Sequence, residues 1–285
     1  MTITRWNPRR ISLPRARLPG EGAPAPKRRL AAVLAGTLAV GALVAGCTHP
    51  QAAAPTHRAH RTTPTDRPTP EAQTTPTTAE PTNVQVPATT MVATLRGTVQ
   101  RFSAPGGQAD GTIPGSWYGS PSNLPVVATQ PGWLEVRLAQ RPNGSTAWVL
   151  ANSATLSVTH YAIVVDLATR HLTLYRDAKA VLSAPAGVGT PQDPTPTGNY
   201  FVALFASPPS PGYGAFVIVT SAHSNAITDW DDSGDAVVAI HGPLGSGAQI
   251  GTTGAAVSHG CIRLHEQDLA RLRPVPAGSP VEIVG

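Results

Sequence analysis

Side chains able to do nucleophilic and acid–base chemistry gather in one stretch near the end of the 285-residue chain. Cys261, one of only two cysteines, directly follows His259 and Gly260. A second histidine, His241, follows an apolar run over 236–240 that we predict to be a buried strand. A thiol is a strong nucleophile when ionised, and a nearby imidazole lowers the pKa of such a thiol. The pattern therefore predicts a cysteine nucleophile served by a histidine.

The residue before the thiol is expected to shape an acyl-transfer site. Gly260 lets the backbone take a conformation or an approach that a side chain would block. Successive amides in such a turn can point at one spot and stabilise a developing oxyanion. A lone cysteine is usually an inert small hydrophobe, but its Gly and His neighbours set Cys261 apart.

The spacing of these residues is specific. Sixteen residues separate His241 from Ser258, which opens Ser258-His259-Gly260-Cys261-Ile262. This pattern resembles the signature of the L,D-transpeptidases with a YkuD-type catalytic domain. The runs YAIVVDLATRHLTLYRD and GVGTPQDPTPTGNY also match that domain, so the resemblance covers nearly all of residues 160–285.

The resemblance implies a role for each motif residue. His241 would be the general base, oriented by the carbonyl of Gly242, and Cys261 the acyl-accepting nucleophile. Some family members carry Asn where this chain has Arg263, so no side-chain amide role is transferred to that position. The remaining predicted oxyanion or substrate residues are Ser258, His259, Gly260, Arg263 and Tyr213, with the amides of 259–261 as oxyanion donors.

Two of these positions keep two interpretations. His259 either touches the substrate or braces the turn. Tyr213, in the Pro- and Gly-rich run 207–214, is either part of a flap over the site or a packed loop aromatic.

The same resemblance implies a reaction. A peptidoglycan tetrapeptide stem would be cut before its terminal D-Ala, form a thioester on Cys261, and pass to the side-chain amine of another stem, giving a 3→3 cross-link. Acylation by carbapenem-type β-lactams is implied, and no metal or organic cofactor is. The alternatives are a carboxypeptidase that trims stems with water, and a wall-binding lipoprotein with an inert domain.

A zinc site is a competing explanation for the histidines. Three of His223, His241, His259, Cys261 and His265 can in principle form a hydrolytic zinc site. The chain has no HExxH, CxxC or paired-carboxylate motif, so this interpretation has weak support.

The basic charge of the chain belongs to its first residues. The net charge is +5, but residues 1–46 hold eight of the 21 Lys and Arg and one of the 16 Asp and Glu, which leaves 13 basic and 15 acidic residues, or −2. Nucleic acid is therefore an unexpected partner.

The N-terminal region has the pattern of an exported lipoprotein. A basic cluster at 27–29 precedes an uncharged run over 30–45, then Gly46-Cys47. This predicts a signal peptide over 1–46, and its end resembles a lipobox with Cys47 as the lipidated residue. A transmembrane anchor is the alternative, but sixteen residues is short of the roughly 20 that a bilayer needs. We predict an anchor on the outer face of the cytoplasmic membrane, with action in the cell wall.

Between anchor and globular part lies a predicted disordered stalk, over 47–90. Of the 43 residues from 48 to 90, 13 are Thr and 8 are Pro. Few of the remaining residues are apolar, so the segment cannot form a core. A small β-barrel-like domain is expected over 91–157, with strands near 126–127, 133–138 and 147–150 and a hairpin turn at Asn143-Gly144. The run 131–150 resembles bacterial Src-homology-type barrels. Trp117, Trp133 and Trp148 form either a ligand platform or core packing.

The catalytic unit, 158–285, is predicted to be a mostly β, sandwich-like domain. Short apolar or alternating runs predict strands at 161–166, 171–175, 202–205, 215–220, 236–240 and 281–284. One helix is expected over 266–273, stopped by Pro274. Gly187-Val188-Gly189 is predicted to be a loop.

Overall fold

The structure, a computed structural model, describes residues 84–230 and 233–285. The predicted signal peptide, Cys47 and nearly all of the stalk lie outside the described residues and stay predictions. The described part is mostly β, as the sequence predicts. In that part, no helix is long and apolar enough to cross a bilayer.

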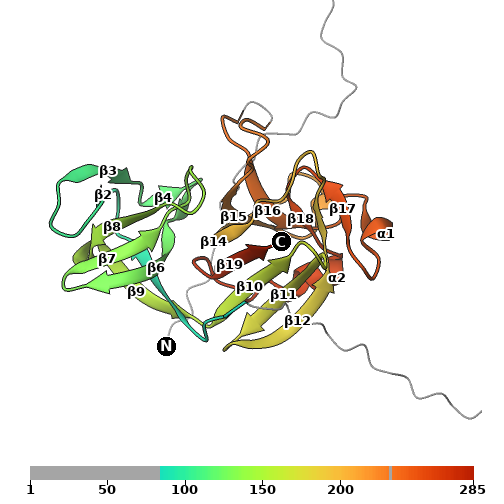
Figure 1. The fold of residues 1–285 in the computed structure, drawn as a ribbon, viewed down its shortest axis with the longest axis horizontal. Coiled ribbons are helices and arrows are strands. Elements are labelled where there is room, and N and C mark those ends of the chain that lie inside the picture. Colours follow the sequence, from blue (N-terminus) through green and yellow to red (C-terminus); the bar gives the residue numbers. More distant parts are fainter. Residues whose placement is uncertain (1–83, 231–232) are drawn as a thin grey trace, which may run out of the picture. The chain divides into compact units, whose positions relative to one another are not determined.

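The first sheet has seven strands in the order β3-β2-β8-β7-β6-β1-β9. In β7, Leu134 and Val136 are buried and alternate with half-buried residues, which confirms the predicted two-residue period. The strands, teal to green in Figure 1, are β1 (Thr90–Leu95), β2 (Val99–Phe102), β3 (Ala109–Ile113), β6 (Asn123–Gln130), β7 (Trp133–Arg137), β8 (Thr146–Leu150) and β9 (Ala154–Thr159), and a separate ribbon pairs β4 (Ser116–Trp117) with β5 (Ser120–Pro121).

Two of the three tryptophans of this region have aromatic neighbours of their own. Trp133 meets Phe102 edge to face at 4.9 Å between ring centroids, and Trp117 lies 4.8 Å from Tyr118 while packing against the core. These contacts favour the packing interpretation for both.

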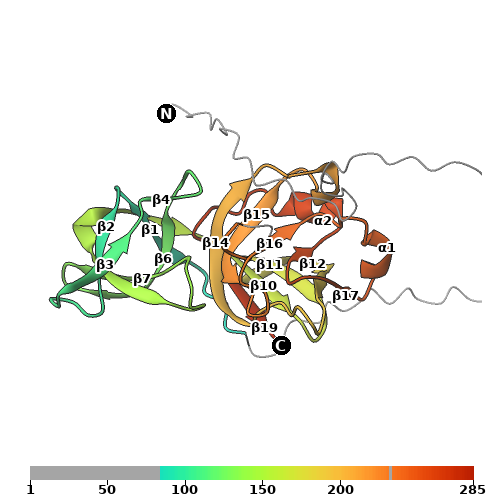
Figure 2. The ribbon, with the colours of Figure 1, turned by 90° about the horizontal axis from the view of Figure 1, so that it is seen from above.

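The second sheet has ten strands in the order β12-β11-β10-β19-β14-β15-β16-β18-β13-β17. Figure 2 shows β10, β11 and β12 beside one another, and α2 contacts β12. Its elements are β10 (Tyr161–Asp166), β11 (His171–Arg176), β12 (Lys179–Pro185), β13 (Gly187–Gly189), β14 (Gly198–Ala206), β15 (Val217–His223), β16 (Val237–His241), β17 (Ala255–Ser258), β18 (Ile262–Arg263), β19 (Pro280–Val284), the 3-10 turns η1 (Ala151–Ser153) and η2 (Pro211–Tyr213), and the helices α1 (Gly247–Ile250) and α2 (Glu266–Arg271).

All six strands predicted for this domain are present, and the predicted helix forms as α2. The loop predicted at Gly187-Val188-Gly189 is wrong, because these residues form β13, which pairs with β17 and β18. A Cβ at Gly187 would lie 2.9 Å from Val257 Cγ2, and one at Gly189 would lie 2.3 Å from the Asp193 carbonyl. These glycines therefore allow close packing rather than a loop. The predicted domain boundary at 157/158 falls inside β9.

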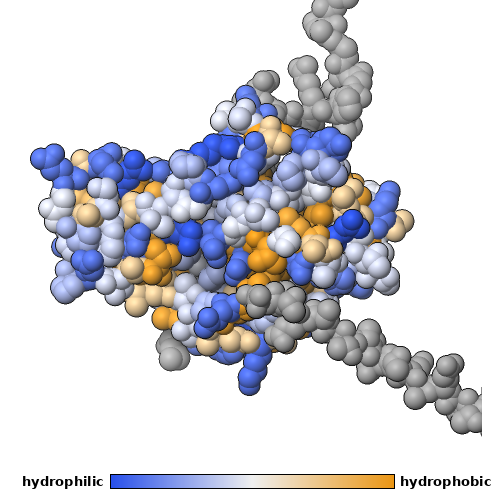
Figure 3. Space-filling model, in the orientation of Figure 1, coloured by the Kyte–Doolittle hydropathy of each residue, from blue (hydrophilic) through white to orange (hydrophobic). Residues whose placement is uncertain are grey.

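The main core lies within the second sheet and under α2. Fully buried members include Ile163, Ile218, Ile240 and Ile262, and Leu269 carries α2 onto the same core. On the face drawn in Figure 3, apolar patches lie among hydrophilic residues. The core fixes the strands that carry the predicted catalytic residues.

Candidate active site

Strand register brings the predicted nucleophile and base together. β16 and β18 run parallel, with Ile240 opposite Ile262 and His241 opposite Arg263. Both isoleucines are fully buried. Cys261 immediately precedes β18, so it lies two residues before Arg263, the residue paired with His241. Strand geometry puts the Cα atoms of His241 and Cys261 roughly 8 Å apart, two positions along neighbouring strands. An imidazole and a thiol at that Cα separation can come within proton-transfer reach when their side chains point toward one another.

The ring of His241 is held in one orientation. Its Nδ1 donates to the Gly242 carbonyl at 2.8 Å, because a carbonyl can only accept. That tautomer leaves Nε2 as the proton-accepting nitrogen of the neutral ring. The Gly242 amide donates to the Tyr213 carbonyl at 2.7 Å, and the Tyr213 ring centroid lies 4.6 Å from that of His241. Tyr213 thus contacts the predicted base.

Only glycine fits at position 242. A Cβ there would lie 2.8 Å from the Gly214 nitrogen and 2.9 Å from Glu266 Oε1. The carbonyl that orients His241 therefore belongs to a backbone packed tightly against η2 and α2.

Both reactive groups are neutral in the resting site. The pKa of His241 is lowered to about 4, chiefly by burial; the hydrogen bond to Gly242 opposes this shift and the positive charge of Arg263 adds to it. Burial also raises the pKa of Cys261, although the Ala239 amide and Arg263 act in the opposite direction. In both groups burial is the largest cause of the shift, and it favours the neutral form.

This arrangement makes folding stability depend on pH. In the unfolded chain His241 has its ordinary pKa of 6.5, so between pH 6.5 and about 4 the unfolded state binds a proton that the folded state does not. Stability must then fall as the pH falls through this window. At pH 5 the loss relative to pH 7.5 is expected to be about 2 kcal/mol from this residue.

Urea unfolding of the wild type and of His241→Gln at both pH values measures that loss. The glutamine variant cannot bind the proton, so its loss between pH 7.5 and pH 5 should be about 2 kcal/mol smaller. Equal losses in the two proteins would contradict the depressed pKa of His241.

The turn from Ser258 to Cys261 is fixed by two hydroxyl groups. Gly260 has φ +113°, a conformation that L side chains rarely adopt, which confirms the need for glycine there. The Ser258 hydroxyl donates to the Cys261 carbonyl and accepts the Gly260 amide at 3.1 Å. The buried Thr195 hydroxyl donates to the Gly260 carbonyl and accepts the Gly189 amide, both at 2.8 Å.

These bonds bear on the predicted oxyanion donors. Because the Gly260 amide donates to Ser258, an oxyanion can use it only after that bond opens. The amides of His259 and Cys261 are the other two predicted donors. Thr195 was not predicted, since a threonine 65 positions before Gly260 carries no local signal of its role.

The segment that carries this geometry is similar to known proteins. Residues 160–283 match the family model of the L,D-transpeptidase catalytic domain, YkuD. This segment is an L,D-transpeptidase catalytic domain. It includes β10 to β18 and nearly all of β19.

Curated relatives agree over the same length of chain. Over 124 residues, the chain is 31% identical to the putative L,D-transpeptidase YkuD of Bacillus subtilis strain 168 and to that of Bacillus licheniformis. Those residues are 43% of this chain and 65% of each relative, so the chain spans less than two thirds of the relatives' length.

Solved structures are similar at lower identity. An L,D-transpeptidase from Mycobacterium smegmatis is 20% identical, with a TM-score of 0.35 over 57% of this chain and 82% of that one. L,D-transpeptidase 3 from Mycobacterium tuberculosis, solved with a faropenem-derived adduct, is 16% identical, with a TM-score of 0.35 over 57% and 91%.

His259 lies at the surface of the L,D-transpeptidase domain. Its side chain is 61% exposed, and its Nε2 is 3.8 Å from Asp193 Oδ2. The Trp230 ring, itself exposed, lies 5.2 Å from the His259 ring between centroids. Trp230 was not predicted as a site residue, because nothing near it in sequence links it to the motif.

Arg263 is the positive charge of the site. Its Nη1 donates to Ser246 Oγ at 3.4 Å, while its buried Nε has no hydrogen-bond partner among the described residues. Burial lowers the pKa of Arg263, and the charges of Cys261 and Tyr213 oppose that effect. The guanidinium therefore lies close enough to Cys261, His241 and Tyr213 to act on all of them.

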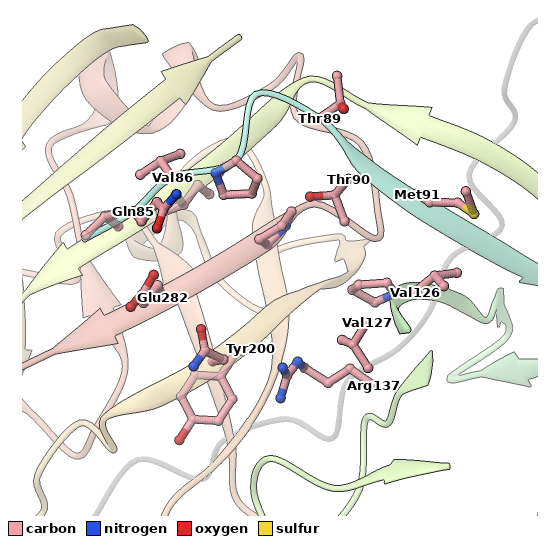
Figure 4. A pocket seen from close by; sticks show the side chains of 17 residues that line it. Gln85, Val86, Thr89, Thr90, Met91, Val126, Val127, Arg137, Tyr200 and Glu282 are labelled. Carbon is pink, nitrogen blue, oxygen red and sulfur yellow. The ribbon is translucent and has the colours of Figure 1, made fainter. Parts of the chain in front are cut away.

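The described residues also bear on the alternative of a metal site, and they contain a surface hollow. No three His, Cys, Asp or Glu side chains within residues 84–230 and 233–285 are grouped as metal ligands would be. The hollow in Figure 4 is lined by the segment 85–91 and by residues of both sheets, among them Arg137, Tyr200 and Glu282. Neither Cys261 nor His241 lines it.

Proposed function

We propose that this protein is a peptidoglycan L,D-transpeptidase that forms 3→3 cross-links through a thioester on Cys261. The observation that carries the proposal is the pairing of His241 with Arg263, two residues after Cys261, with the ring of His241 fixed by the Gly242 carbonyl. Nucleophile, base and orienting group together are what thiol acyl transfer requires.

The first half-reaction forms the acyl-enzyme. His241 Nε2 takes the thiol proton as Cys261 Sγ attacks the carbonyl between the third stem residue and the terminal D-Ala. The oxyanion that forms accepts hydrogen bonds from the backbone amides of His259 and Cys261. His241 then gives its proton to the departing D-Ala amine, the C–N bond breaks, and the thioester remains.

The second half-reaction reverses these proton transfers. The side-chain amine of another stem's third residue attacks the thioester, His241 accepts a proton from that amine, and the C–S bond breaks. The proton returns to Cys261 and an amide cross-link is released. The same thioester chemistry accounts for acylation by carbapenem-type β-lactams, whose strained amide supplies the carbonyl.

A substrate carboxylate is the natural partner of Arg263. The guanidinium carries a buried Nε–H without a partner among the described residues, and it interacts electrostatically with Cys261. A carboxylate of the donor stem would satisfy that donor. Export, lipidation at Cys47 and a stalk over 47–90 would deliver this site to the wall at the outer face of the cytoplasmic membrane.

Product analysis tests the transferase. The purified protein is incubated with a disaccharide tetrapeptide, and its products are separated and weighed by mass spectrometry. We expect cross-linked dimers joined between the third residues of two stems, with release of D-Ala. Tripeptide without dimers would assign a carboxypeptidase instead, and unchanged substrate would leave an inert wall-binding domain.

A further inference from the structure

The turn between β7 and β8 makes contacts that a simple hairpin does not need. Its Asn143-Gly144 pair was predicted as the turn, and Gly144 does take a positive φ of 81°. Yet the side chains of Arg141 and Asn143 bond to residues 80 to 86 positions away in sequence, in and after β15.

Asn143 binds the main chain at the end of β15 as a neighbouring strand would. Its Nδ2 donates to the His223 carbonyl at 2.7 Å, and its Oδ1 accepts the His223 amide at 2.9 Å. The side chain thus satisfies both backbone groups of one residue at the point where β15 ends.

Arg141 binds both ends of the segment that joins β15 to β16. At the start, its Nη1 donates to the Ser224 carbonyl at 2.8 Å and its Nη2 to the Ile227 carbonyl at 3.1 Å. At the other end, its Nε donates to Asp235 Oδ1 at 3.2 Å. A planar guanidinium is suited to holding several acceptors in one fixed geometry.

Asp235 is itself fixed in this arrangement. It accepts from His223 Nδ1 at about 3 Å and from the Ala236 amide at 2.7 Å. Burial alone would raise the pKa of Asp235, but these bonds and the one from Arg141 outweigh it and lower that pKa. An ionised carboxylate therefore faces the guanidinium.

The segment held in this way carries Trp230 to the site. The Trp230 amide donates to the Asp235 carbonyl at 2.9 Å, so the tryptophan is one hydrogen bond from the residue that Arg141 holds. Its ring lies 5.2 Å from His259, two residues before Cys261. These contacts connect the β7–β8 turn, through Asp235 and Trp230, to His259.

We infer that Arg141 and Asn143 are positioning residues, which hold residues 223–227 and Asp235 so that Trp230 lies against His259 at the site. The first β sheet then contributes to acyl transfer instead of serving only as a spacer or wall-binding module. The consequence for acylation rests on the proposed function, whereas the placement of Trp230 does not.

The placement is tested by NMR of the histidine rings at pH 7. The ring current of Trp230 shifts the Cε1–H resonance of His259, which His259→Gln identifies by its disappearance. Trp230→Ala defines the unshifted position. We expect Arg141→Ala and Asn143→Ala to move the His259 resonance most of the way to that position, and Arg96→Ala, at an exposed arginine of β1's following turn, to leave it unchanged.

Two further variants separate positioning from general damage. Arg141→Lys keeps the charge but cannot reach three acceptors at once, so it should behave like Arg141→Ala. Thermal melting identifies any variant that has lost its fold. If Asn143→Ala is unfolded, Asn143→Asp is used in its place, because aspartate can still accept the His223 amide. A His259 resonance that stays at its wild-type position in folded Arg141→Ala, while Trp230→Ala moves it, overturns the inference.

The rate of acylation by imipenem tests the functional part. We expect about a 10-fold slower rate in Trp230→Ala, Arg141→Ala and Asn143→Ala, and a wild-type rate in Arg96→Ala, because a displaced binding group loses orientation at the reacting centre. A wild-type rate in Arg141→Ala overturns the functional part. A wild type that is never acylated contradicts the proposed function instead, and the NMR comparison still decides the placement of Trp230.

Discussion

Replacement of Cys261 by alanine is expected to abolish acylation by a carbapenem, a loss of roughly 10⁴-fold or more. In the proposed mechanism the sulfur forms the thioester, and a thiol is a far stronger nucleophile than an alcohol or an amide. Incubation of the wild type with imipenem should add one drug equivalent to the intact mass, and the variant should keep its unmodified mass. Formation of cross-linked dimers should be lost in parallel.

The chain supplies a matched control, since it has only one other cysteine. Cys47→Ala removes that thiol and should leave both labelling and dimer formation intact in the purified protein. Melting temperatures of the two variants verify that each is folded. Labelling that persists in Cys261→Ala and disappears in Cys47→Ala would place the reactive thiol outside the catalytic domain and contradict the mechanism.

Local patterns were sufficient to predict much of the fold. The strands at 161–166 and 171–175 follow from apolar runs between turn residues, and both form at nearly those bounds. The helix ends near its predicted stop at Pro274 because proline cannot continue it. These elements are set by their own residues, so the sequence alone specifies them.

What failed depends on contacts between distant segments. Gly187 and Gly189 carry a loop-like composition, but packing against Val257 and Asp193 makes them a strand. Thr195 bonds to Gly260 across 65 positions, and Arg141 to Ser224 across 83. Hydrogen bonds of this kind leave no periodic signal in the chain.

The charge state of the site also could not be predicted from the sequence. A cysteine with histidines nearby suggests a thiolate, but ionisation depends on how deeply the groups are buried. Burial of His241 and Cys261 moves their two pKa values apart in the direction that keeps both neutral. In the proposed mechanism the proton therefore moves during the attack, and the reaction needs the base.

Replacement of His241 by glutamine is expected to slow carbapenem acylation by about 10²- to 10⁴-fold at pH 7. Glutamine can still donate a hydrogen bond toward the Gly242 carbonyl, but it cannot take the thiol proton. Stopped-flow or mass-resolved labelling rates measure the loss. His160→Gln, at an exposed histidine paired with Asp177, is the matched control and should keep the wild-type rate.

The pH dependence separates loss of a base from loss of structure. Because the base must be neutral, the wild-type rate should rise with pH through about 4 and then stay level across neutral pH. In His241→Gln only spontaneously ionised thiol reacts, and burial raises the pKa of that thiol. Its rate should therefore climb about tenfold per pH unit through neutral pH, where the wild type is flat. Parallel profiles in the two proteins would show that His241 does not accept the proton of Cys261.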